Sequence, residues 1–294
     1  MLECGSKLAL GSANFGLDYG LANHSGKLTK TELEEILFEA NSANIRIIDT
    51  AQAYGDSEAR IGSLCITEKF NIVTKIGIGS EKDYVKGKVK YLVKQSCERL
   101  KQPRLYAVML HQPEILLSDI GDQIIKELQI LKEQNIIFKV GVSIYSPEIL
   151  EEISKFLQLD IVQLPFNIFD QQILSSGWIN KLKNNGTEIH TRSAFLQGLL
   201  LMQQSSLPSY FTNTWPSLFN SWYNFLETNG VDALYVALNF VLKQDWIDKV
   251  VVGVDSASQL KTLLEVEKSL ISMDFPQLGC DDTNLINPSK WAIV

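Results

Sequence analysis

Short runs of apolar and β-branched residues alternate with longer amphipathic segments along almost all of the 294 residues. This alternation is the strongest constraint on the fold, because it predicts a parallel sheet that is covered by helices. The candidate strands are Lys7–Leu10, Ile45–Ala51, Asn71–Ile76, Tyr106–His111, Lys139–Ile144, Ile161–Phe166, Glu188–Ser193 and Lys249–Val254. The candidate helices are Lys30–Asn44, Ser57–Thr67, Asp83–Leu100, Ser118–Gln134, Pro147–Leu157, Leu174–Asn185, Val231–Lys243 and Ser256–Ser269.

Eight strand–helix units that fill the chain favour an α/β fold of one domain, a closed (β/α)8 TIM barrel over residues 1–294. The alternative is an open doubly wound sheet, which would carry a GxGxxG turn after its first strand. The chain has LGSANFG there instead. Ser57 and Ser256 are expected to be helix N-caps, and Pro147 suits the first turn of its helix.

Two segments lie outside this regular pattern. Residues Gly198–Gly230 form a long aromatic loop in which no helix is expected, and Met273–Val294 form a C-terminal tail. Compact domains rarely carry so long a loop unless it serves a function. We therefore expect both segments to lie near the barrel mouth and to influence substrate choice. Trp215, Trp222 and Trp291 are the candidate pocket walls, although simple packing accounts for most of the other aromatic residues.

Composition excludes several classes of protein. The net charge is −7 and no cluster of Lys and Arg is longer than two residues, which disfavours a nucleic-acid partner. The uncharged stretch 193–226 contains no continuous apolar run of about 20 residues, so no membrane span is expected. The four cysteines are far apart and have neither metal-ligand spacing nor a disulfide pattern. Together with an N-terminus unlike a signal peptide, they predict a soluble cytoplasmic protein without a metal.

Four residue types that suit carbonyl chemistry follow three neighbouring strands. Asp49 and Tyr54 follow the second strand, Lys75 lies at the end of the third and His111 at the end of the fourth. Active sites of such barrels form at this edge, where adjacent strand ends converge within roughly 10 Å. A nearby ammonium group would lower the pKa of a phenol and make it a better proton donor. We therefore expect Lys75, held by Asp49, to tune Tyr54.

In this arrangement His111 would orient a bound carbonyl while Tyr54 protonates its oxygen and a hydride arrives at its carbon. Any one of these residues alone is more often part of a salt bridge at the barrel rim or of the core. His190, inside EIHTRS, is interpreted as such a satisfied core residue.

The combination of DTAQAYGDSE, TK and LHQP resembles the aldo-keto reductase family, and the resemblance extends over nearly the whole chain. It implies that Asp49, Tyr54, Lys75 and His111 form the catalytic tetrad of that family. Further motifs, LGSANFG, GVSIYSPE, IVQLPFN, TRSAFLQGLL and VVGVDSASQL, resemble its cofactor-binding segments. The cofactor-binding residues that the resemblance implies are Gly11, Ser12, Ser143, Gln163, Arg192, Ser193, Gly198, Gly253, Ser256 and Gln259.

Three positions depart from the family pattern. Ile144 replaces a common Asn, and Arg192 replaces an aromatic residue that often stacks on the nicotinamide. At the adenosine end Asp255 and neutral residues stand where relatives place basic ones, and Lys261 is the only nearby cation. The resemblance and the helix N-terminus at Ser256 favour NADPH as the cofactor, with NADH as the alternative and a preference within about tenfold.

The expected function is an NAD(P)H-dependent oxidoreductase that reduces an aldehyde or ketone to an alcohol, or catalyses the reverse. The segment GLDYGLAN, with Asp18 and Tyr19, resembles bacterial relatives linked to surface sugars and suggests a sugar or nucleotide-sugar substrate. One alternative is a nicotinamide-binding regulatory or redox-sensor protein with little turnover. Another is a barrel with unrelated lyase or isomerase chemistry.

Overall fold

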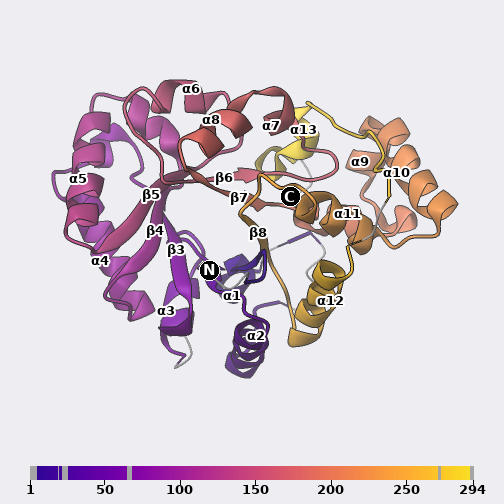
Figure 1. Ribbon diagram of the computed structural model, residues 1–294, viewed down its shortest axis with the longest axis horizontal. Helices are drawn as coiled ribbons and strands as arrows, with labels where there is room; N and C mark the ends of the chain where they lie inside the picture. Colours follow the sequence, from indigo (N-terminus) through magenta and orange to yellow (C-terminus); the bar gives the residue numbers. More distant parts are fainter. Residues whose placement is uncertain (1–4, 19, 22–25, 65–67, 271–272, 292–294) are drawn as a thin grey trace.

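In a computed structural model, which describes residues 5–18, 20–21, 26–64, 68–270 and 273–291, eight parallel strands close into a barrel in chain order (Figure 1). The strands are β1 (Leu8–Gly11), β2 (Ile47–Asp49), β3 (Asn71–Ile76), β4 (Leu105–Leu110), β5 (Ile137–Ser143), β6 (Ile161–Pro165), β7 (Glu188–Arg192) and β8 (Lys249–Val252). The predicted single-domain (β/α)8 barrel is confirmed.

Along β2, β3 and β6, side chains inside the barrel change from apolar to polar. Ala9, Ile47, Val73, Ala107, Met109, Ile161 and Val251 form an apolar cluster of their own. Successive side chains of a strand point to opposite faces, so residues two positions further along also face the interior. Asp49, Lys75 and Gln163 occupy such positions after Ile47, Val73 and Ile161. The interior of the barrel therefore carries charged and amide groups at the carboxyl ends of β2, β3 and β6, beyond the apolar cluster.

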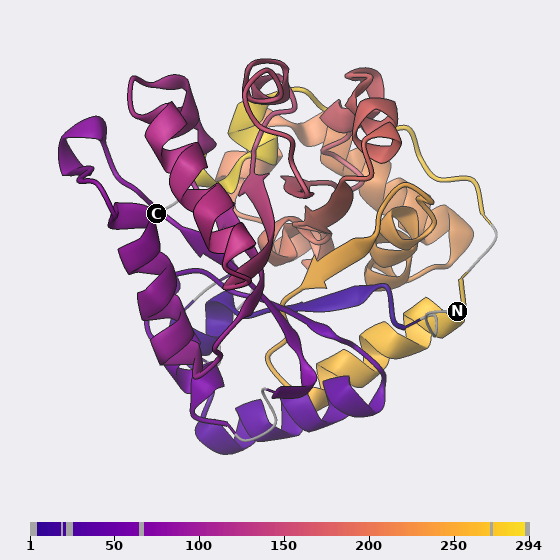
Figure 2. The same cartoon turned by 60° about the vertical axis from the view of Figure 1, so that its left-hand side comes forward.

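Helices surround the barrel, and those that follow the first and last strands lie side by side. The longer ones are α2 (Lys30–Ser42), α4 (Lys88–Leu100), α5 (Gly121–Glu133), α8 (Trp178–Asn184), α11 (Ala233–Leu242) and α12 (Ala257–Lys268). The shorter ones are α1 (Ala13–Gly16), α3 (Ser57–Gly62), α6 (Ile149–Ile153) and α7 (Gln172–Ser175). Helices α2 and α12 pack together outside the β1–β8 pair, as Figure 2 shows.

Glycines divide or shorten two of the expected helices. Gly87 has a φ of 91° and precedes α4, so this helix begins later than Asp83. Gly177 has a φ of 74° and separates α7 from α8. This left-handed backbone region is accessible to glycine at little cost, whereas a continuous helix does not pass through it.

The two expected N-caps differ in outcome. Ser256 caps α12, because its Oγ accepts a hydrogen bond from the backbone N of Gln259. Ser57 does not cap α3; Asp56 occupies the N-cap position there and makes no side-chain cap bond. The buried Oγ of Ser57 instead lies 2.9 Å from both the backbone O and the Oγ of Ser12. Ser57 therefore fastens the start of α3 to the end of β1.

The segment Gly198–Gly230, which we expected to be a loop, is largely helical. It contains the end of the 3-10 turn η4 (Leu196–Leu201), then η5 (Gln204–Ser206), α9 (Ser209–Thr214) and α10 (Pro216–Asn229). Pro216 stands in the first turn of α10, where a missing N–H is tolerated, and Gly230 ends the helix. Phe219 and Trp222 share its buried face, three residues apart. The segment lacks charged residues until Glu227, so aromatic, amide and hydroxyl side chains form its amphipathic pattern.

The described part of the tail packs against this aromatic region and against the loop after β6. The backbone N of Cys280 donates to the carbonyl O of Phe169 at 2.7 Å. Beyond it lie α13 (Thr283–Ile286) and the 3-10 turn η6 (Pro288–Lys290). The ring of Trp291 meets Phe211 of α9 edge to face, with centroids 5.0 Å apart. Residues 292–294 of the predicted tail lie outside the described residues. Within the described residues, none of the helices combines the length and apolar character needed to cross a bilayer.

Replacing Trp222 with Ala should lower the free energy of unfolding by about 3–5 kcal/mol, because it empties a large site in the core. Trp222 is fully buried, and its Nε1 donates to the carbonyl O of Leu200. Trp215→Ala is the matched control, since Trp215 is half-buried, and it should cost clearly less. Urea unfolding of the two variants measures the difference. Equal losses would contradict the assignment of Trp222 to the core.

Candidate active site

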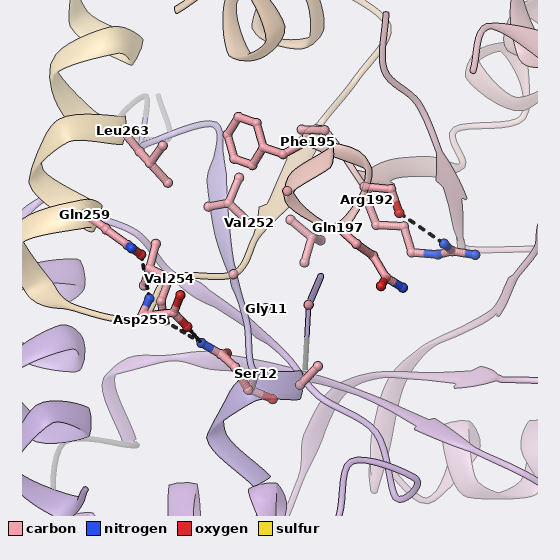
Figure 3. A pocket seen from close by; sticks show the side chains of 18 of the residues that line it. Gly11, Ser12, Arg192, Phe195, Gln197, Val252, Val254, Asp255, Gln259 and Leu263 are labelled. Carbon is pink, nitrogen blue, oxygen red and sulfur yellow. Dashed lines mark hydrogen bonds between the residues drawn. The ribbon is translucent and has the colours of Figure 1, made fainter. Parts of the chain in front are cut away.

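A cavity of about 460 Å³ opens at the carboxyl ends of β1, β2, β7 and β8 (Figure 3). Its volume is in the range of small-molecule sites. Asp49 and Tyr54 line it, and so do seven of the ten expected cofactor-binding residues. These seven are Gly11, Ser12, Arg192, Ser193, Gly198, Gly253 and Gln259.

The four expected catalytic residues gather beside this cavity. Lys75 and Asp49 are almost completely buried and form an ion pair inside the barrel. The Lys75 Nζ also lies 5.3 Å from the centroid of the Tyr54 ring. The rings of Tyr54 and His111 meet edge to face, with centroids 6.0 Å apart. The structure therefore brings an acid, a phenol, an ammonium group and an imidazole into one cluster.

Two close backbone approaches fix Tyr54 in this place. A Cβ on Gly16 would lie 2.0 Å from the carbonyl O of Tyr54, so α1 can lie against this loop only with glycine there. Gly55 has a φ of 57°, and a Cβ on it would lie 2.5 Å from the carbonyl O of Gly16. The glycines of NFG and AYG are thus needed for the contact between the loop after β1 and the loop after β2.

The protonation of Tyr54 differs from the sequence-based expectation, in which Lys75 lowers its pKa. Burial, together with the nearby Asp49 carboxylate, raises the pKa of Tyr54 above its usual value. Burial and the positive charges of Lys75 and Arg192 lower the pKa of His111 to about 4. Around neutral pH Tyr54 is therefore a protonated phenol and His111 an uncharged imidazole. Both can donate a hydrogen bond to an oxygen atom.

Gln163 and Ser143, which we expected to hold the nicotinamide carboxamide, belong to a buried chain of hydrogen bonds. The Gln163 Nε2 donates to the Asp49 Oδ2 at 2.7 Å, and the Ser143 Oγ donates to the Gln163 Oε1 at 3.4 Å. Both side chains are buried and neither lines the cavity. Gln163 therefore satisfies the Asp49 oxygen that Lys75 does not bind.

Arg192 occupies the rim of the cavity between two neighbours. Its guanidinium carbon lies 4.3 Å from the centroid of the Tyr145 ring, and its Nη2 donates to the carbonyl O of Ile144 at 3.1 Å. Two of the three departures from the family pattern, Ile144 and Arg192, are thus in direct contact. The guanidinium group is held at one end of the cavity, where it presents a fixed positive charge.

Some residues that line the cavity were not predicted from the sequence, and some predicted residues do not line it. Ser256 does not line the cavity, because its hydroxyl caps α12. Asn14 lines it and was missed, although it lies within LGSANFG, two residues after Ser12. Apolar walls that no sequence signal distinguishes from core residues are contributed by Phe195, Leu201, Leu234 and Leu263.

The tryptophans that we expected to form the pocket walls do not line the cavity. They are Trp215, Trp222 and Trp291, all of them among the described residues. Asp18 is exposed, and Tyr19 lies outside the described residues.

His190 is buried, as expected, but only half satisfied. Its Nε2 lies 2.8 Å from the Glu188 Oε1, whereas its Nδ1 has no hydrogen-bond partner among the described residues. Among the described residues, His, Cys, Asp and Glu side chains do not come together in groups of three that could hold a metal ion.

The model of the Aldo/keto reductase family matches residues 7–278, and the chain therefore belongs to this family. Two curated relatives agree with this assignment. D-arabinose 1-dehydrogenase of Saccharomyces cerevisiae is 25% identical, over 96% of this chain and 88% of the relative. The uncharacterized oxidoreductase YqkF of Bacillus subtilis is 26% identical, over 87% of this chain and 89% of the relative.

Solved structures share the fold. The holo form of aldo-keto reductase AKR11C1 from Bacillus halodurans superposes with a TM-score of 0.74 at 21% identity, covering 92% of this chain and 89% of the other. Glycerol dehydrogenase AKR11B4 from Gluconobacter oxydans gives 0.70 at 22% identity, covering 91% and 88%. The chain is an oxidoreductase of the carbonyl-reducing class, whose members generally use nicotinamide cofactors.

Asp170, in the loop after β6, gives a pH-dependent prediction. Burial raises its pKa to about 7, and its Oδ2 has no partner among the described residues. The folded state therefore binds this proton more tightly than the unfolded state, and stability is lost as the pH rises from about 4 through 7. Asp170→Asn should raise the melting temperature at pH 8, where the buried carboxylate is charged, and change it little at pH 5. Thermal unfolding at both pH values tests this, and an equal change at the two would contradict the cause given.

Proposed function

We propose that this enzyme transfers a hydride between a nicotinamide dinucleotide and the carbonyl carbon of an aldehyde, ketone or open-chain sugar. The observation that supports this best is the position of the buried Lys75–Asp49 pair, with Tyr54 and His111 around it, beside the cavity. A module that only binds the cofactor would not need an acid and a group that holds it.

The residues of the cavity suit a nicotinamide dinucleotide. A Cβ on Gly253 would meet no atom within 4 Å, so a side chain there would enter the space that the cavity provides. The Asn14 Oδ1 is buried in the cavity wall and accepts no hydrogen bond from the described residues, which leaves an acceptor for a ligand hydroxyl or amino group. We assign Gly11, Ser12, Ser193, Gly198, Gly253 and Gln259 to the binding of this cofactor.

The bound cofactor supplies the hydride in reduction and accepts it in oxidation. Tyr54 donates its phenolic proton to the carbonyl oxygen as the C–H bond forms, and it takes the proton back in the reverse direction. His111, uncharged because its pKa is lowered to about 4, donates a hydrogen bond to the same oxygen and orients the carbonyl. General acid catalysis of this kind contributes about 10²- to 10⁴-fold to the rate.

Lys75 and Asp49 act on Tyr54 rather than on the substrate. The ammonium group beside the phenol stabilises the negative charge that develops on the Tyr54 oxygen when its proton leaves. Asp49 keeps Lys75 charged, and Gln163 holds the second oxygen of Asp49. We propose that Ser143 and Gln163 also contact the carboxamide of the cofactor, as the family pattern implies.

A sugar or nucleotide sugar is the substrate class that we propose. The relative named D-arabinose 1-dehydrogenase supports a sugar. Our expectation of control by residues 198–230 and by the tail remains a prediction. Within residues 198–230, Gly198 and Leu201 of η4 line the cavity. We also propose a cytoplasmic location, since Cys97 and Cys280 are free thiols; Cys4 and Cys65 lie outside the described residues.

Tyr54→Phe should lower kcat at least about a hundredfold, the scale of a lost general acid, while cofactor affinity stays within about twofold. Tyr84→Phe is the control, since this phenol binds Glu127 on α5, away from the cavity. Turnover of D-arabinose and a panel of carbonyl compounds is followed at the nicotinamide absorbance. Near-normal turnover of folded Tyr54→Phe would refute the assignment of the acid, and lack of turnover by the unmodified enzyme across the panel would favour a sensor.

Lys75→Met should also lower kcat strongly, because the developing charge on Tyr54 loses a nearby cation. It should in addition destabilise the fold by about 3–5 kcal/mol, since Asp49 would remain buried without its ion-pair partner. Kinetics and urea unfolding of the same variant separate the two effects. A change confined to KM would assign Lys75 to substrate binding instead.

A further inference from the structure

The charges that line the cavity are distributed unevenly. Asp49, Arg192 and Asp255 are its charged lining residues within the described part of the chain. Arg192 lies at one end of the pocket, beside the tetrad, and Asp255 lies with Gln259 at the opposite end (Figure 3). The end formed by β8 and α12 therefore presents a carboxylate without a lining cation.

Three hydrogen bonds hold Asp255 in this position. The Asn14 Nδ2 donates to the Asp255 Oδ1 at 2.9 Å and to the carbonyl O of Val254 at 2.6 Å. The backbone N of Asp255 donates to the Gln259 Oε1 at 2.7 Å. Asn14 itself is only 5% exposed, so the carboxylate is attached to a rigid part of the barrel.

Three groups that could attract a phosphate at this end already have partners within the protein. Lys261, the nearby cation noted in the sequence, is exposed, pairs with Glu39 of α2 at 3.5 Å and does not line the cavity. At the start of α12 the backbone N of Gln259 donates to the Ser256 Oγ at 3.1 Å. This N–H, and that of Asp255, are therefore used by the protein's own side chains rather than left for an anion.

We propose that Asp255, positioned by Asn14, selects the dinucleotide without a 2′-phosphate, so that this chain uses NAD(H) in preference to NADP(H). A fixed carboxylate accepts hydrogen bonds from the hydroxyl groups of the adenosine ribose, as acidic residues do in other dinucleotide sites, and repels a phosphate at the same place. The inference rests on the proposed function, which places a nicotinamide dinucleotide in this cavity. It reverses the preference for NADPH that the family resemblance implied.

The test is isothermal titration of the purified enzyme with NAD⁺ and, separately, with NADP⁺. NAD⁺ should bind at least about tenfold more tightly, a difference of about 1.4 kcal/mol. Asp255→Asn keeps the size of the side chain and removes its charge. It should reduce the ratio of the NADP⁺ and NAD⁺ dissociation constants at least fivefold, mainly by improving NADP⁺ binding.

Asp255→Ser provides a second variant in which the contact to Asn14 is also lost. Glu265→Gln is the control, because Glu265 is an exposed carboxylate on α12 that does not line the cavity; its ratio should equal that of the unmodified enzyme.

Each result has one meaning. Equal affinities, or tighter binding of NADP⁺ by the unmodified enzyme, would overturn the inference while leaving the proposed function intact. An NAD⁺ preference that persists in both Asp255 variants would overturn the assignment to Asp255. If neither NAD⁺ nor NADP⁺ binds, the proposed function itself is refuted, and this inference with it.

Discussion

The buried ion pair between Lys75 and Asp49 is the interaction on which the rest of the site depends. Lys75 is 1% exposed and Asp49 3% exposed, and either charge alone would be very costly in the barrel interior. The pair becomes tolerable because Gln163 and then Ser143 complete the hydrogen bonding of Asp49. These four residues come from β2, β3, β5 and β6, so the network joins the carboxyl ends of strands on both sides of the barrel. Tyr54 and His111 are arranged around a centre that cannot shift without exposing a charge to apolar surroundings.

The sequence predicted the barrel well because two independent signals agreed. β-branched runs mark the strands, and the helices between them carry amphipathic patterns with capping residues such as Ser256. The positions of Asp49, Lys75 and His111 followed from a rule of the fold, that polar residues at strand ends share one edge of a parallel barrel. The aromatic segment was misjudged because its Pro, Ser and Asn residues are typical of loops, whereas Pro216 stands in the first turn of α10, where proline is tolerated.

Other properties of the site depend on distances that no sequence pattern contains. The direction of the Tyr54 pKa shift is decided by burial and by the Asp49 carboxylate, whereas the sequence showed only that a lysine would be near. Gln163 matched a family motif for cofactor binding, but its contact with Asp49 depends on the register that pairs β5 with β6 and on what faces the barrel interior. Asp255 was noticed as an acidic residue, yet whether it faces the cavity or the solvent required the orientation of the turn before α12.

The link from Asn14 to Val254 and Asp255 joins the loop after β1 to the loop after β8, across the seam where the barrel closes. Some 240 residues of chain separate these partners. During synthesis the N-terminal partner leaves the ribosome long before the C-terminal one exists, so the adenosine end cannot assemble until the last strand has been made and has paired with the first. We therefore expect cofactor capture to come late in the life of the nascent chain, after the tetrad strands β2, β3 and β4 can already be in place. A dinucleotide that binds across this seam would then stabilise the closed barrel by mass action, because its binding requires the first and last strands to be paired.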